Sequence, residues 1–168
     1  DYEALKRCGF DCYDHGWFMD TDDPIYGSLF TCDDKTFEAV VTEEARRAAA
    51  AGITVFQVHS PWTCPPPEET MGDAFEQRKW DITRSIVGTR LLGARYLVIH
   101  PFMPKVDDAT YLSFNRQCFE MFLEIAAKND VVLCLENMPF GDQPLARPGE
   151  MLDFVKSFHS PYFKMCLD

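Results

Sequence analysis

The sequence is short of positive charge, of long apolar runs and of paired cysteines. It has 16 Lys and Arg against 27 Asp and Glu, a formal net charge of -11, which opposes binding to a phosphate backbone and predicts no nucleic-acid partner. No apolar run reaches the length of a membrane span and the N-terminus has no signal-peptide pattern, so we expect no membrane association. The seven Cys include no CxxC pair, which indicates free thiols and a reducing, cytoplasmic compartment.

Three common functional motifs are also absent. The chain has no GxGxxG fingerprint, no P-loop and no GxSxG nucleophile elbow, so a nucleophilic triad is unsupported. The 168 residues are 46% hydrophobic and 14% aromatic, a composition typical of a folded globular protein. Their number predicts a single domain over residues 1–168.

Apolar runs typical of strands alternate with segments that have helical periodicity. Each run is short and is followed by a helix, a pattern that predicts a parallel sheet built from βαβ units. The expected strands cover residues 10–18, 53–61, 95–101, 131–139 and 163–168. We expect five helices. The first ends at Gly9, the second covers 42–52 with Thr42 as its cap, the third ends at 92–94, and the last two cover 108–128 and 147–158. Residues 19–35 are expected to form a loop.

Four of the expected strands end on a residue that can bind metal. These residues are His59, His100, Glu136 and Asp168, separated by 100 − 59 = 41, 136 − 100 = 36 and 168 − 136 = 32 residues. Such intervals fit one strand and one helix each. Because the carboxyl ends of parallel strands meet at one rim, where α/β proteins place their active sites, the four side chains are expected to converge. Two His, one Glu and one Asp suit a divalent metal.

Each of these residues also has an ordinary explanation. Glu136 follows the apolar run VVLCL, and its carboxylate needs either solvent, a basic partner or a cation. On the first strand, His15 is a weaker candidate for the same rim, and Asp14 could equally be the inward residue. Trp17 and Trp62 could line a small pocket or pack in the core.

Four stretches together resemble one known family. AGITVFQVHSPW, LLGARYLVIHP, VVLCLENMP and the terminal MCLD are similar to the xylose isomerase-like barrel superfamily, which contains sugar phosphate isomerases and epimerases and relatives of apurinic endonucleases. The opening LKRCGFDCYDHGWF resembles the second strand of that family with the helix before it. The likeness runs along essentially the whole chain.

The resemblance implies an incomplete barrel. The family fold is a (β/α)8 TIM barrel, which needs about 250 residues, and the five strands expected here would be strands two to six. Glu136 and Asp168 would be metal ligands, and in isomerase members a His and a Glu from strands outside this chain complete the set. In the endonuclease branch, residues matching His59 and His100 also bind metal.

The function expected from this resemblance is a metal-dependent sugar or sugar-phosphate isomerase or epimerase that works through a metal-stabilised enediolate. Glu136, His100 and His59 would be catalytic, and the cofactor would be Mn²⁺, Mg²⁺, Co²⁺ or Zn²⁺. One alternative is an endonuclease-type phosphodiesterase with several zinc ions. Another is a partial barrel that self-associates without catalysis. In each case the two open sheet edges of an incomplete barrel predict a homo-oligomer.

Overall fold

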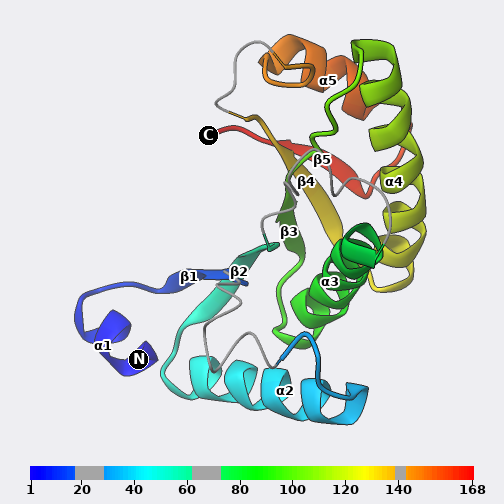
Figure 1. Ribbon diagram of the computed structural model, residues 1–168. Coiled ribbons are helices and arrows are strands. Elements are labelled where there is room, and N and C mark those ends of the chain that lie inside the picture. Colours follow the sequence, from blue (N-terminus) through cyan, green and yellow to red (C-terminus); the bar gives the residue numbers. More distant parts are fainter. Residues whose placement is uncertain (18–28, 62–72, 139–142) are drawn as a thin grey trace.

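The computed structural model describes residues 1–17, 29–61, 73–138 and 143–168, and these form one five-stranded sheet (Figure 1). All neighbouring strands are parallel, and the strand order follows the sequence. Both features confirm the expected partial barrel. The strands are β1 (Cys12–Gly16), β2 (Thr54–His59), β3 (Tyr96–Ile99), β4 (Val132–Glu136) and β5 (Phe163–Cys166).

The helices that follow the strands lie on one side of the curved sheet (Figure 1). These are α2 (Asp34–Ala50), α3 (Asp73–Leu91), α4 (Asp108–Lys128) and α5 (Pro148–Lys156), whereas α1 (Tyr2–Arg7) lies near β1 at the N-terminal end. The other side of the sheet carries none of these four helices. In a closed barrel, this concave side would be the interior.

The helix α2 begins earlier than the sequence predicts. Asp33 is its cap and accepts a hydrogen bond from the backbone N–H of Thr36 at 3.0 Å, so Thr42 lies inside the helix. The expected loop over 19–35 was wrong at its end, because an Asp that precedes a helical segment is as good a cap as Thr. The helix stops as expected before Gly52, whose φ of +70° favours glycine.

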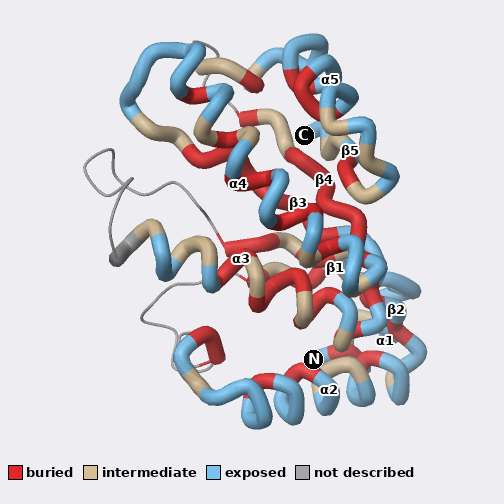
Figure 2. Tube along the Cα trace, turned by 90° about the vertical axis from the view of Figure 1, so that its right-hand side faces the viewer, coloured by how far each residue is buried: buried red, intermediate tan, exposed pale blue. Residues whose placement is uncertain are grey.

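The two faces of β4 show how the sheet separates core from site. Leu133 and Leu135 are fully buried and belong to the main core under the helices. Val132 and Cys134 alternate with them, face the concave side and form a smaller apolar cluster there. Glu136 is next in this concave series. Figure 2 shows the buried residues along the strands and on the helix sides that face them.

The described cysteines are all free. Burial raises the pKa of Cys118 to about 12 and that of Cys134 to about 11, so these thiols stay protonated and pack as small apolar groups. No helix in the described part of the chain combines the length and the apolar character needed to cross a bilayer.

Gly88 of α3 gives a prediction about packing. A Cβ at this position would lie 2.7 Å from Cζ2 of Trp17 and 3.1 Å from Cζ of Phe37, both buried. Overpacking costs about 1–3 kcal/mol and the gain in helix propensity is about 1 kcal/mol. We therefore expect Gly88→Ala to lower the free energy of unfolding in urea, by up to about 2 kcal/mol. Gly149→Ala in α5, where nothing lies within 4 Å, is the control, and an equal loss in both would contradict the packing explanation.

The sheet leaves β1 and β5 as its two edge strands. Unpaired backbone groups along an edge offer pairing sites to another chain. Self-association of the 168-residue chain therefore stays a prediction. Light scattering coupled to size exclusion tests it, and a monomer across the accessible concentration range would contradict it.

Candidate metal centre

The strand register brings three predicted ligands to one rim. Ile99 of β3 pairs with Leu135 of β4. His100 follows Ile99 and Glu136 follows Leu135, so these two residues lie side by side. His59 ends β2 and pairs with Val98, two residues before His100 on the same concave face. The prediction that these residues share the carboxyl end of the sheet is confirmed for His59, His100 and Glu136.

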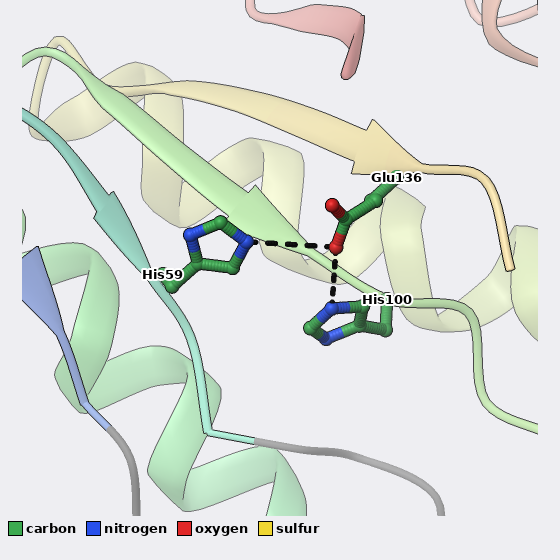
Figure 3. A group of neighbouring side chains, drawn as sticks. All are labelled: His59, His100 and Glu136. Atoms are coloured by element: carbon green, nitrogen blue, oxygen red, sulfur yellow. Dashed lines mark hydrogen bonds and ion pairs between the residues drawn. The ribbon is translucent and has the colours of Figure 1, made fainter. Parts of the chain in front are cut away.

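The three side chains point toward one another (Figure 3). Nε2 of His100 lies 2.7 Å from Oε2 of Glu136, and Nε2 of His59 lies 3.5 Å from the same oxygen. One ligand atom of each residue lies within 4.8 Å of the others. The side chains are 20%, 7% and 14% exposed for His59, His100 and Glu136. Two imidazoles and a carboxylate, partly shielded and within reach of one ion, fit a divalent cation.

Asp14 of β1 lies behind His59. Its Oδ2 is 3.0 Å from Nδ1 of His59, and Nε2 of Gln57 donates to the same oxygen at 3.0 Å. A hydrogen-bonded carboxylate behind an imidazole is the usual arrangement around metal-binding histidines. The contacts thus run from Gln57 through Asp14, His59 and Glu136 to His100, across four strands.

These contacts shift the pKa values of the two histidines in opposite directions. The hydrogen bond to Asp14, with the charge of that carboxylate and of Glu136, raises the pKa of His59. Burial lowers the pKa of His100, although Glu136 opposes this. Burial alone would raise the pKa of Asp14, but the hydrogen bonds from His59 and Gln57 outweigh it and lower the pKa. A proton therefore binds to His59 in preference to His100.

Asp168 follows β5 and lies beside the end of β4. Its backbone N–H donates to Oδ1 of Asn137 at 2.9 Å, and its backbone carbonyl accepts from Nδ2 of Asn137 at 3.1 Å. Its side chain is exposed, and the cluster within 4.8 Å consists, among the described residues, of His59, His100 and Glu136 without it. A role for Asp168 as a ligand stays a prediction.

Of the two candidates on β1, Asp14 is the residue on the concave face. His15 is 2% exposed and lies on the other face, where its ring meets Trp17 edge-on with centroids 4.6 Å apart. Trp17 is 2% exposed and packs against Phe30 and Phe37 in the core. Trp62 lies outside the described residues.

Sequence reasoning missed Gln57 and the link between Asp14 and His59. One signal for Gln57 was present, since it precedes His59 by two positions and so shares its face of the strand. The link to Asp14 depends on a register shift between Tyr13 and Asp14, which pairs Asp14 with Gln57. Nothing in the local sequence announces such a shift.

Comparison with known proteins places the whole chain in one family. Residues 2–168 match the family model described as xylose isomerase-like TIM barrel. No curated protein matches the sequence.

Solved structures give the same fold. A D-psicose 3-epimerase crystallised with D-fructose superimposes with a TM-score of 0.74 at 16% identity, over 99% of this chain and 56% of that one. A xylose isomerase-like TIM barrel protein from Mycobacterium smegmatis in complex with magnesium gives 0.67 at 17% identity, over 99% and 54%. The IOLI protein with a bound zinc atom gives 0.69 at 11% identity, over 97% and 54%. The chain spans little more than half the length of these structures.

Proposed function

Because this chain belongs to the xylose isomerase-like TIM barrel family, we propose that it carries part of the site of a metal-dependent sugar or sugar-phosphate isomerase or epimerase. The observation that supports this is the meeting of His59, His100 and Glu136 within 4.8 Å at the carboxyl end of three adjacent parallel strands. That rim is where barrel enzymes bind substrates. The D-psicose 3-epimerase that shares the fold is named for a ketose and was crystallised with another, D-fructose. This supports a sugar as the substrate.

His59, His100 and Glu136 would hold the cation, with Asp168 proposed as a further ligand from the neighbouring strand. The donor set suits Zn²⁺, Co²⁺ or Mn²⁺, and an oxygen-rich completion of the site would also admit Mg²⁺. When bound, the cation supplies a Lewis acid that stabilises the negative charge of an enediolate.

We propose Glu136 as a group that transfers the proton. Both imidazole contacts go to its Oε2, so Oε1 can accept a proton from the carbon next to the substrate carbonyl and return it. His59 and His100 would bind the cation or donate hydrogen bonds to substrate oxygens. Epimerisation also needs a positioned acid or base on the opposite face of the enediolate, and we propose that it comes from beyond these five strands.

An endonuclease-type phosphodiesterase with several zinc ions is the second candidate, favoured by the presence of two histidines in the cluster. The composition of the segments after β1 and β2 argues against a phosphodiesterase. Residues 17–33 and 60–72, which connect β1 and β2 to their next helices, contain several Asp and Glu and no Lys or Arg. A phosphate backbone requires basic side chains around it, whereas an uncharged sugar does not.

Proton exchange provides the test. The 168-residue chain and the complete gene product would each be incubated with Mn²⁺ or Zn²⁺ and a panel of ketoses in D₂O, with NMR detection of deuterium next to the carbonyl and of new epimers. We expect metal-dependent exchange and epimerisation by the complete product. For the 168-residue chain we expect little or no turnover, because we propose that the opposing proton-transfer group lies beyond its five strands.

Three outcomes would contradict the proposal. Rapid epimerisation by the 168-residue chain would show that the chain already contains a complete active site. Cleavage of DNA at abasic sites by the metal-loaded complete product, with no exchange into any ketose, would favour the phosphodiesterase. If the complete product shows no exchange and no cleavage, this result would support the remaining alternative, a barrel that self-associates without catalysis.

A further inference from the structure

We infer that Asp14 is a positioning residue that holds the ring proton of His59 on Nδ1 and so keeps Nε2 open for a cation. This inference rests on the proposed metal site. It concerns a residue outside the group of ligand atoms that lie within 4.8 Å of one another, on a strand next to the three that supply this group.

The geometry places the carboxylate where it can act on one ring nitrogen only. Oδ2 of Asp14 lies 3.0 Å from Nδ1 of His59, while Nε2 of the same ring points to Oε2 of Glu136 at 3.5 Å. Oδ2 also accepts a hydrogen bond from Nε2 of Gln57 at 3.0 Å. The Gln57 amide thereby holds the carboxylate in place, and Asp14 holds the imidazole.

One irregularity in the pairing of β1 with β2 makes this contact possible. Tyr13 pairs with Val55, but Asp14 pairs with Gln57, so the register of β1 against β2 shifts by one residue between them. Without that shift Asp14 would pair with Phe56 instead of Gln57. Such irregularities redirect side chains next to functional sites. This one adds Phe56 to β2 and so turns Gln57 and His59 to the concave face beside Asp14.

The chemistry of a neutral imidazole explains why the contact matters. The ring carries one N–H, and the other nitrogen offers a lone pair. Glu136 Oε2 lies on the Nε2 side and by itself would draw the proton to Nε2, which would block that nitrogen as a ligand. A carboxylate on the Nδ1 side competes for the same proton. Asp14, at the shorter distance and held by Gln57, keeps the proton on Nδ1.

The test combines the ring tautomer with metal affinity. In the metal-free protein, at a pH high enough for the His59 ring to have lost its second proton, ¹⁵N NMR of the ring is expected to show Nδ1–H in the parent and a shift toward Nε2–H in Asp14→Ala. Zn²⁺ titration calorimetry is expected to show a dissociation constant about 10- to 100-fold weaker for Asp14→Ala. Asp14→Asn, which keeps an acceptor oxygen, should fall between the two.

Asp11→Ala is the matched control, because Asp11 is an exposed aspartate three residues earlier that pairs with Lys6; it should leave the tautomer and the affinity unchanged. An Nε2–H tautomer in the parent, or parent affinity in Asp14→Ala, would overturn the inference. Failure of the parent to bind Zn²⁺ would instead contradict the proposed metal site, and the tautomer of His59 in the parent and in Asp14→Ala would still decide whether Asp14 holds the proton. Circular dichroism of each variant checks that it is folded.

Discussion

Replacing Glu136 with Gln is expected to remove the stabilisation of this chain by Mn²⁺ or Zn²⁺. A cation present at 100 times its dissociation constant stabilises the folded state by about 2.7 kcal/mol, which raises the melting temperature of a chain of this size by about 5–10 °C. Glu136 supplies the negative charge of the cluster and contacts both imidazoles. The neutral amide that replaces it cannot compensate the charge of the cation.

Glu124→Gln provides the control for this experiment. Glu124 is an exposed residue of α4, and the change of charge is the same. Thermal melts of the three proteins over a metal titration give the comparison. An equal rise in melting temperature for the parent and Glu136→Gln would show that the cation binds elsewhere.

The second large effect concerns pH. The raised pKa of His59 means that a proton competes with the cation for Nε2 as the pH falls through that value. Below the pKa of His59 the affinity for Mn²⁺ is expected to fall about tenfold for each pH unit, because one proton must leave for each cation bound. His100, whose pKa is lowered by burial, begins to compete only at lower pH and then steepens the dependence.

Fluorescence or calorimetric titrations with Mn²⁺ between about pH 8 and 5 measure this dependence. The sign follows from the direction of the shift, since a histidine with a raised pKa takes up its proton sooner on acidification and loses its lone pair sooner. An affinity that does not change across this range would contradict the participation of His59. In His59→Ala the nitrogen that both the proton and the cation bind is gone. This variant should bind Mn²⁺ weakly, and its affinity should fall only at the lower pH at which His100 takes up a proton.

The fold and the meeting of three of the four candidate ligands at one rim could be predicted, because both depend on local pattern. An apolar run of the right length followed by His59, His100 or Glu136 identifies a buried strand and its end, and the parallel topology then gathers the ends at one rim. Neither step needs knowledge of how two strands are aligned. For the same reason the sequence left open whether His15 or Asp14 faces the site.

Features that depend on contacts between distant segments could not be predicted. The bond between Asp14 and His59 requires the register of β1 against β2, including its one-residue shift, and the pattern of either strand alone leaves that register free. The start of α2 was missed for another reason, because Asp33 and Thr42 are both competent caps and the choice between them depends on tertiary packing of the first two turns.

The central claim is that one divalent cation binds between His59, His100 and Glu136. Anomalous diffraction at the zinc edge, from crystals of the 168-residue chain soaked in Zn²⁺, tests it most directly. The account predicts an anomalous peak about 2.0–2.2 Å from Nε2 of His59, Nε2 of His100 and a carboxylate oxygen of Glu136. A peak elsewhere, with the imidazoles still in direct contact with Glu136 at saturating Zn²⁺, would contradict it.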